Sequence, residues 1–358
     1  MGYIELMRYS EKACIPISAI IELTNKCNQD CVMCYNVQRH EKELTTAEAK
    51  SAIRQLEKLG CLFLTFTGGE VLARADFFEI ACYARKRGFG IRILTNGTLI
   101  DEEAADKLAS LSPLSVEISL FSLKPEIHDG ITRTPGSLER TIEAMRLLKK
   151  RRVKVVAKST FMKQNAGEFA PLKEHCRKKK ITFSHTALVT PKNDGSLGPC
   201  KFRLSDRELA EWHADRFKGS KTPILRRIAE RENNKEPIYL IGCYAGRNTC
   251  RISPYGDVSP CIELGRIWGG NIRERSLKEI WHNSEAFKQL RETGSQILEA
   301  CTSCRLKSYC ITCPGLRMIE GGGIDMPLRE SCRQARIHRL AVRRALAANE
   351  KNNKEKSA

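Results

Sequence analysis

Short apolar runs alternate with amphipathic stretches along the first half of the chain. Six runs have the length and composition of strands, at residues 18–23, 61–66, 90–95, 115–121, 153–161 and 181–189. The stretches between them carry apolar residues at helical spacing, at 46–60, 75–88, 101–111, 137–151 and 168–180, with Thr46 expected as a cap. Strands that alternate with helices of this length form βαβ units, so the pattern predicts an α/β fold with a parallel sheet. It fits a barrel, a partial barrel and an open doubly wound sheet alike.

This alternation ends near Thr190. Residues 205–232 have the pattern of one or two polar helices, whereas residues 236–335 are rich in Cys, Gly and Pro and lack a periodic apolar pattern. A module of that composition usually relies on metal or disulfide for its stability. The expected organisation is an α/β unit at 1–190, a helical bridging segment at 191–235, a loop-rich module at 236–335 and a basic C-terminal helix or tail at 336–358.

Composition narrows the class of protein. The chain has 358 residues, 41% of them hydrophobic, which supports a buried core. No stretch approaches the roughly 20 apolar residues of a membrane span, and the first residues lack a secretory signal, so we expect a cytoplasmic protein without a membrane partner. Cytoplasmic reductants keep thiols free, and the sixteen cysteines therefore favour metal ligation. The formal charge of +19 suits an anionic partner such as nucleic acid, an acidic peptide or an anionic cofactor, without choosing among them.

Three cysteines, Cys27, Cys31 and Cys34, directly follow the first expected strand with the spacing C-x3-C-x2-C. Three thiolates on one loop can each bind an iron of an iron-sulfur cube and leave the fourth iron without a protein ligand. A structural zinc site would need a fourth close ligand, and His40 is the nearby candidate.

Further motifs follow the next strands in order: TGGE at 67–70, LTNG at 94–97, ISLFS at 118–122 and HDGITR at 128–133. With the cysteine triplet, this series resembles the radical S-adenosylmethionine (radical SAM) superfamily. The resemblance implies a partial (β/α)6 TIM-like barrel that binds a [4Fe-4S] cluster and S-adenosylmethionine at the carboxyl ends of its strands. The cluster ligands would be Cys27, Cys31 and Cys34.

The same resemblance implies contacts to S-adenosylmethionine. The backbone of Gly68 and Gly69 would approach its methionyl end, and Glu70 would accept hydrogen bonds from its ammonium group. The carboxylate or ribose would be bound by Ser119 and Arg133, with Asn96 in the same site. Many members carry Tyr, His or Phe near the adenine where this chain has Met33, which can still pack on a ring.

The C-terminal cysteines resemble the SPASM extension of radical SAM peptide maturases, with one additional thiol. Eight ligands would hold two auxiliary [4Fe-4S] clusters, the first bound by Cys243, Cys250, Cys261 and Cys313 and the second by Cys301, Cys304, Cys310 and Cys332. Zinc knuckles are the alternative for paired C-x2-C motifs. The remaining cysteines, Cys14, Cys61, Cys82, Cys176 and Cys200, have the pattern of small buried hydrophobic residues, with Cys200 in a loop.

Fully ligated auxiliary clusters suit electron transfer, which favours an oxidoreductase that modifies a peptide or protein side chain oxidatively. Sulfatase maturases place an Asp base directly after the third SPASM cysteine; this chain has Cys261-Ile262-Glu263, so they are disfavoured and Glu263 is the candidate base. The alternatives are a radical SAM enzyme acting on a small molecule such as a haem precursor, and a zinc-knuckle nucleic-acid-binding protein. Nucleic acid is disfavoured because aromatic residues are only 6% and are not interleaved with the basic runs.

The resemblance also implies partners. A flavodoxin- or ferredoxin-type protein would supply the electron that reduces the radical SAM cluster. Only 26 residues precede Cys27, too few for a leader-binding winged-helix domain, so a separate leader-binding protein or the barrel rim would recognise any leader peptide.

Overall fold

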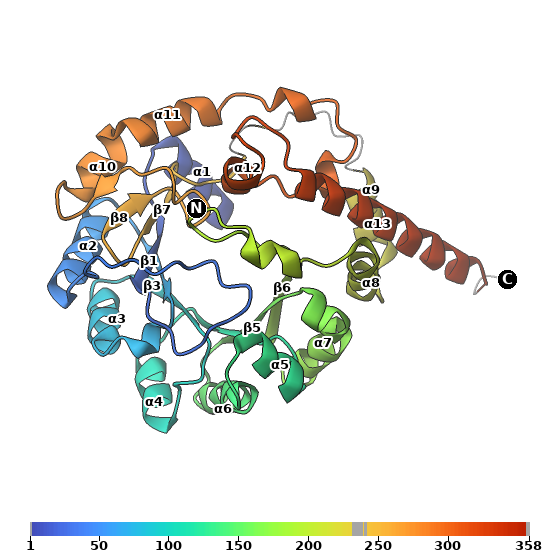
Figure 1. Ribbon diagram of the computed structural model, residues 1–358, viewed down its shortest axis with the longest axis horizontal. Coiled ribbons are helices and arrows are strands. Elements are labelled where there is room, and N and C mark those ends of the chain that lie inside the picture. Colours follow the sequence, from blue (N-terminus) through green and yellow to red (C-terminus); the bar gives the residue numbers. More distant parts are fainter. Residues whose placement is uncertain (1, 231–238, 240–241, 356–358) are drawn as a thin grey trace.

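Six parallel strands form an arc with helices on its outer side in the computed structural model, which describes residues 2–230, 239 and 242–355 (Figure 1). The strands are β1 (Ser18–Thr24), β2 (Phe63–Gly68), β3 (Gly90–Thr95), β4 (Ser115–Ser119), β5 (Val155–Thr160) and β6 (Thr182–Thr186). Each pairs in parallel with the next along the chain. Because β6 lies at the edge of the sheet, the barrel is partial, as expected.

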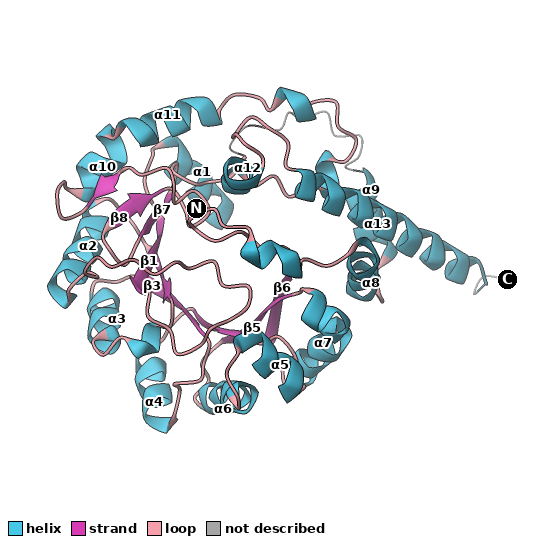
Figure 2. Cartoon of the chain, in the orientation of Figure 1, coloured by secondary structure: helices cyan, strands magenta, loops and turns pink. Residues whose placement is uncertain are grey.

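The intervening helices cover the outer face of this arc, and Figure 2 shows them along the outer side of the strands from α2 to α7. They are α2 (Thr46–Lys58), α3 (Phe77–Lys86), α4 (Glu102–Ser110), α5 (Pro125–Thr132), α6 (Ser137–Lys150) and α7 (Phe169–Lys178). The sequence pattern missed α5. The expected cap at Thr46 was wrong: the Thr45 side chain accepts the Glu48 N–H, and the Glu48 carboxylate accepts the Thr45 N–H.

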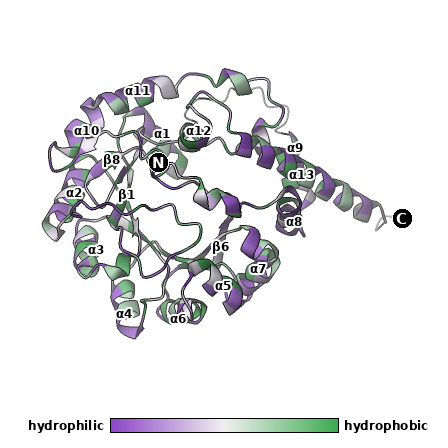
Figure 3. Cartoon of the chain, viewed as in Figure 1, coloured by the Kyte–Doolittle hydropathy of each residue, from purple (hydrophilic) through white to green (hydrophobic). Residues whose placement is uncertain are grey.

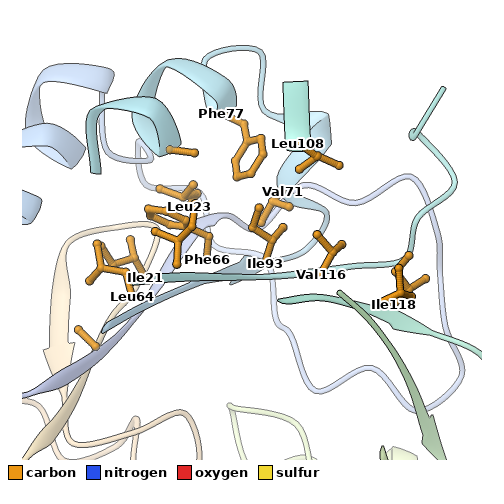
Figure 4. Close-up of a cluster of buried hydrophobic side chains, with 14 of the residues drawn as sticks. Ile21, Leu23, Leu64, Phe66, Val71, Phe77, Ile93, Leu108, Val116 and Ile118 are labelled. Carbon is orange, nitrogen blue, oxygen red and sulfur yellow. The ribbon is translucent and has the colours of Figure 1, made fainter. Parts of the chain in front are cut away.

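Alternation along the strands decides where the core lies. Ile21, Leu64, Phe66 and Ile93 are fully buried between the sheet and the helices (Figure 4). Polar residues occupy the alternate positions, including Thr67, Glu117, Ser119 and Lys158, and these line a cavity inside the arc. In Figure 3 the helices around the sheet carry both hydrophilic (purple) and hydrophobic (green) residues, as amphipathic helices do. The core therefore lies outside the sheet, and the interior of the barrel is left for polar groups.

The cysteine-rich half of the chain continues the same sheet. β7 (Thr249–Ile252) pairs in parallel with β1, and the antiparallel strands β8 (Asp257–Ser259) and β9 (Gly270–Asn271) follow, so one nine-stranded sheet has the order β6-β5-β4-β3-β2-β1-β7-β8-β9. Around this extension lie α1 (Tyr3–Lys12), α10 (Leu277–Asn283), α11 (Glu285–Gly294) and α12 (Pro314–Glu320). The boundary expected between 235 and 236 lies outside the described residues.

The bridging segment contains α8 (Asp206–Phe217) and α9 (Thr222–Glu230), and both pack against the last helix, α13 (Arg329–Glu355). We expected the C-terminal helix from 336, but it begins at Arg329, so Cys332 lies on it. Short 3₁₀ turns complete the fold: η1 (Val71–Ala73), η2 (Lys163–Glu168), η3 (Gly198–Phe202), η5 (Glu299–Cys301) and η6 (Lys307–Tyr309). No helix within the described ranges is long and apolar enough to cross a membrane.

Candidate active site

A cavity of about 960 Å³ opens at the carboxyl ends of the six barrel strands. Parallel α/β folds build their ligand sites at this end of the sheet. Nine of the residues expected to bind the cluster or S-adenosylmethionine line it: Cys27, Cys31, Met33, Cys34, Gly68, Gly69, Asn96, Ser119 and Arg133. The fold therefore brings into one cavity side chains that lie more than a hundred positions apart in the sequence.

The loop that carries the cysteine triplet is fixed by hydrogen bonds to neighbouring strand ends. The Asn36 side chain donates to the carbonyl oxygen of Gly68 at 3.0 Å, and the backbone N–H of Val32 donates to Ile131 at 2.9 Å. Asn96 donates to the Asn28 side chain at 2.8 Å, next to Cys27. The loop is thus positioned by the ends of β2 and β3 and by α5.

Gly68 and Gly69 are required by this close packing. Gly68 has a φ of +141°, and a Cβ there would lie 2.1 Å from the carbonyl oxygen of Thr24. A Cβ on Gly69 would lie 2.2 Å from the carbonyl oxygen of Lys26. The glycines therefore allow the cysteine loop itself to approach the end of β2. The sequence had suggested only that they allow a ligand to approach.

The pKa values of the three thiols in the triplet are set by burial, by neighbouring charges and by hydrogen bonds. Burial, together with the neighbouring thiols of Cys34 and Cys27, raises the pKa of Cys31 to about 12. Backbone N–H groups of Gln29 and Asn36 hydrogen-bond to the sulfurs of Cys27 and Cys34 and lower their pKa values against the effect of burial. Soft sulfur donors that receive N–H groups fit an iron-sulfur cluster, which binds thiolates and displaces their protons.

Two further groups of thiols lie in the C-terminal half. Burial raises the pKa of Cys261 well above its usual range, and Glu263, Cys313 and Cys243 raise it further. Burial also raises the pKa of Cys310 to about 12, with contributions from Cys332, Cys301 and Cys304. Among described residues, no three His, Cys or acidic side chains have the spacing to hold a single metal ion. A cluster is different because each thiolate binds its own iron, and the two sets of donors fit such groups.

Arg317 lies between these two groups. Its side chain is 2% exposed, and its pKa is lowered by burial and raised by thiols of both groups, Cys301 and Cys310 on one side and Cys313 and Cys243 on the other. The structure therefore places one buried cation between the two sets of auxiliary thiols.

Residues 21–176 match the family model described as the radical SAM superfamily, and residues 243–305 match the SPASM model, described as an iron-sulfur cluster-binding domain. The AdoMet-dependent heme synthase of Methanosarcina barkeri is 30% identical over 313 residues, which cover 82% of this chain and 89% of the relative. The chain belongs to the radical SAM superfamily.

Other relatives of this radical SAM protein include the mycofactocin maturase MftC of Mycolicibacterium smegmatis, which is 29% identical over 87% of this chain and 81% of the relative. The crystal structure of Streptococcus suis SuiB bound to precursor peptide SuiA has the same fold, with a TM-score of 0.70 at 20% identity over 92% of this chain and 79% of that one. The protein is therefore an enzyme whose radical SAM domain binds a [4Fe-4S] cluster and S-adenosylmethionine and whose SPASM domain binds auxiliary iron-sulfur clusters.

One expected contact in the radical SAM site was wrong. Glu70 is fully buried and does not line the cavity, so its carboxylate does not face the ammonium of a ligand there. Its oxygens instead accept hydrogen bonds from the Thr95 hydroxyl at 2.6 Å and the Asn96 N–H at 2.7 Å. Glu70 joins the ends of β2 and β3.

Cys250, which we expected as a cluster ligand, is a buried residue of the hydrophobic core. It is 1% exposed in β7, pairs with Ala19 of β1 and belongs to the main hydrophobic core, where its neighbouring thiol is Cys61. The next residue, Arg251, lies on the other face of the strand and pairs with the carboxylate of Glu22. Cys250 therefore packs in the core, on the side of the sheet opposite Arg251.

Of two further residues expected in the active site, Arg133 lines the barrel cavity and Glu263 does not. Glu263 raises the pKa values of Cys261 and Cys313, as well as those of Glu22 and Tyr35, and is not among the described residues that line the barrel cavity. Arg133 lines the cavity and pairs with Asp30 at 2.8 Å. Its φ of +52° at the end of α5 turns the chain at the rim of the cavity.

Several residues that line the cavity were missed by the sequence interpretation. Glu117 and Lys158 project into it from β4 and β5 and form an ion pair of 3.2 Å. Lys192 and Lys201 line the cavity from the segment after β6. Glu117 and Lys158 could have been predicted, because each is a charged residue at an alternate position of an otherwise apolar strand. The two loop lysines carried no such signal in the sequence.

Proposed function

We propose that this radical SAM enzyme cleaves S-adenosylmethionine reductively and oxidatively modifies a side chain of a peptide or protein. The observation that carries the proposal is the single cavity at the strand ends, in which three thiols share a wall with polar residues from neighbouring strands. The C-terminal half, with its two further sets of thiols, supports an oxidation. After losing a hydrogen atom the substrate must also lose an electron, and auxiliary clusters in this half would accept it.

In this proposal Cys27, Cys31 and Cys34 bind the radical SAM cluster. When bound, the cluster would supply the electron for reductive cleavage of S-adenosylmethionine to methionine and a 5′-deoxyadenosyl radical, the species that would take a hydrogen atom from the substrate. Asn96 keeps the loop next to Cys27 in place through its bond to Asn28.

The other residues that line the cavity bind S-adenosylmethionine. Arg133 and Ser119 bind its carboxylate or ribose, and Gly68 and Gly69 supply backbone groups at its methionyl end. Met33 packs against hydrophobic neighbours at the rim and provides an apolar surface for the adenine. Arg133 would exchange its Asp30 partner for the ligand, which the 55% exposure of its side chain permits.

The auxiliary thiols hold two iron-sulfur groups through which the electron leaves the substrate. Cys301, Cys304, Cys310 and Cys332 bind one of them, and the set around Cys261 binds the other. We further propose a flavodoxin- or ferredoxin-type electron donor, a separate leader-binding protein where the substrate has a leader, and a cytoplasmic location, where reductants keep thiols available for iron. The barrel at 1–190, the bridge at 191–235, the SPASM module at 236–335 and the basic end at 336–358 are the proposed units.

The test is anaerobic reconstitution of the full chain with iron and sulfide, followed by reduction in the presence of S-adenosylmethionine. We expect about twelve irons per chain and reductant-dependent formation of 5′-deoxyadenosine. A short peptide encoded beside the gene, co-expressed with the enzyme, should lose two hydrogen atoms for each new crosslink in its mass spectrum. An unchanged peptide mass in the presence of an enzyme that forms 5′-deoxyadenosine would reject that pairing.

A second candidate is oxidation of a haem precursor. It is favoured by the relative named AdoMet-dependent heme synthase and by the cationic side chains of Lys158, Lys192 and Lys201 in the cavity, which suit the carboxylates of such a molecule. Parallel incubations with a peptide and with a haem precursor separate the two candidates. The precursor would lose carbon dioxide from a propionate together with hydrogen, which mass spectrometry distinguishes from a crosslinked peptide.

A further inference from the structure

The loop that carries the cysteine triplet is closed at its base by hydrogen bonds. Asn25 and Val37 stand before and after the triplet, and the Asn25 side chain donates a hydrogen bond to the Val37 carbonyl oxygen. The backbone N–H of Asn25 donates to the carboxylate of Glu43 at 2.6 Å. Asn25 and Val37 both line the cavity. The two ends of the loop therefore meet at Asn25, and the position of Asn25 sets where the loop enters and leaves the cavity wall.

A tyrosine from the C-terminal half contacts this base. Tyr255 lies in the turn between β7 and β8 and is 5% exposed. Its hydroxyl accepts the backbone N–H of Arg39 at 3.0 Å and the Asn25 side chain at 3.4 Å, and it donates to the Arg39 carbonyl oxygen at 3.4 Å. A hydroxyl has one donor and two acceptor sites, so these three bonds use it completely. Tyr255 thus contacts the chain on both sides of the triplet.

The turn that carries Tyr255 is held in place by further contacts. The Ser253 hydroxyl accepts the backbone N–H groups of Tyr255 at 3.2 Å and of Asp257 at 3.0 Å. The Arg39 guanidinium lies 4.7 Å from the centroid of the Tyr255 ring and pairs with the Asp257 carboxylate at 2.6 Å. A buried polar network in which every group has a partner fixes the position of its members. The hydroxyl of Tyr255 therefore stands at a defined place beneath the cysteine loop.

We propose that Tyr255 is a positioning residue for the radical SAM site, whose hydroxyl holds the base of the cysteine loop in the arrangement that binds S-adenosylmethionine. The inference rests on the proposed function and deepens it, because it makes the barrel site depend on the C-terminal half of the chain. Without the hydroxyl, the loop occupies the competent arrangement for only a fraction of the time. The apparent affinity for S-adenosylmethionine falls by that fraction, whereas a molecule that is correctly bound reacts as before.

Hydrogen–deuterium exchange tests the contact. The reconstituted full chain is compared as wild type and as Tyr255→Phe, which removes only the hydroxyl. Backbone amides of residues 25–39 should exchange about tenfold faster in the variant, and those of α2 and β2 should exchange as in the wild type.

Tyr83→Phe is the matched control for this experiment. The Tyr83 hydroxyl on α3 also accepts two hydrogen bonds, from Arg54 at 3.3 Å and Arg87 at 3.2 Å, and Tyr83 does not line the cavity. Its removal should leave exchange at residues 25–39 unchanged. Unchanged exchange of this segment in Tyr255→Phe, or faster exchange along the whole chain, would overturn the inference.

Kinetics of S-adenosylmethionine cleavage separate a positioning role from a structural one. In Tyr255→Phe the KM for S-adenosylmethionine should rise about tenfold, while kcat for 5′-deoxyadenosine formation stays within about twofold of the wild type. Iron should remain at about twelve per chain. A residue that only supports folding would lower kcat through a smaller active fraction and leave KM unchanged. That result, or equal KM values in the two proteins, would contradict the positioning role.

These outcomes are distinct from a failure of the proposed function. A wild-type chain that forms no 5′-deoxyadenosine, or that holds only about four irons, would reject the proposed function itself. The exchange experiment needs no turnover, so it reports on Tyr255 in either case. A fully loaded and active wild type combined with either contrary result above would reject only the role of Tyr255.

Discussion

The backbone N–H of Asn96 donates a 2.7 Å hydrogen bond to the buried carboxylate of Glu70, which connects the end of β3 to the end of β2. The other carboxylate oxygen accepts the Thr95 hydroxyl and the Leu72 N–H. Burial raises the pKa of Glu70, and these three hydrogen bonds oppose that rise. Asn96 lines the cavity and Glu70 does not, so the Glu70 carboxylate acts on the site by holding the backbone of Asn96 in place.

Glu70→Gln should therefore destabilise the whole chain as well as the site. The amide would direct a donor toward a donor, and one unsatisfied buried group costs about 1–3 kcal/mol of the free energy of unfolding. Urea denaturation measures this loss. Glu103→Gln is the control, because Glu103 is exposed on α4 and pairs with Lys107. Equal stability of the two variants would contradict the buried role of Glu70.

Loss of the triplet should remove one cluster only. Cys31→Ala should lower iron by about four per chain and abolish 5′-deoxyadenosine formation, while leaving the auxiliary clusters in place. Iron analysis and chromatography of the products give both readouts. Cys82→Ala, at an exposed position of α3, should retain full iron and activity. Retained cleavage in Cys31→Ala would show that the triplet does not form the reactive site.

Arg317 should set the reduction potentials of the auxiliary clusters. A cation between two anionic groups favours the reduced, more negative states, so Arg317→Met should shift both potentials to more negative values by tens of millivolts, on the order of 1 kcal/mol per electron. Redox titration followed by electron paramagnetic resonance measures the shift. Arg317→Lys keeps the charge and should recover most of it. Unchanged potentials in a fully loaded Arg317→Met protein would contradict this electrostatic role.

The ion pair between Arg203 and Glu320 should be a main connection between the cavity rim and the SPASM module. Both guanidinium–carboxylate distances are 2.7 Å, the two side chains are 13% and 10% exposed, and Arg203 also donates to the Val189 carbonyl. Arg203→Leu should cost about 3 kcal/mol, because it leaves a buried carboxylate unpaired.

A double-mutant cycle measures this coupling. Arg203→Leu combined with Glu320→Leu should be more stable in urea than the sum of the single variants predicts. Arg207→Leu is the control, because Arg207 forms an exposed pair with Glu211 on α8 and its loss should hardly change stability. Additive effects of Arg203→Leu and Glu320→Leu would mean that the pair contributes nothing as a unit.

The local pattern of apolar and polar residues was sufficient to predict the strands of the barrel. The six runs of branched and aromatic residues correspond to β1 to β6, because alternation along a strand is a local property of the sequence. α5 was not predicted from the pattern because it is short and contains a glycine, Gly130. Its stability comes from contacts such as that between His128 and Phe121. The cysteine triplet was equally visible, since its spacing on one loop already limits its chemistry.

The sequence alone determined the strands, the family and the residues that could bind iron. Tertiary structure decided which of these residues meet. Cys250 and Arg251 are adjacent, and only the pairing of β7 with β1 directs Cys250 into the core and Arg251 toward Glu22. Glu70 likewise stands in a ligand-binding motif, yet the approach of β3 buries it. The physical reason is the same for both: a side chain's local direction follows from its own strand, but its neighbours depend on elements that are distant in the sequence.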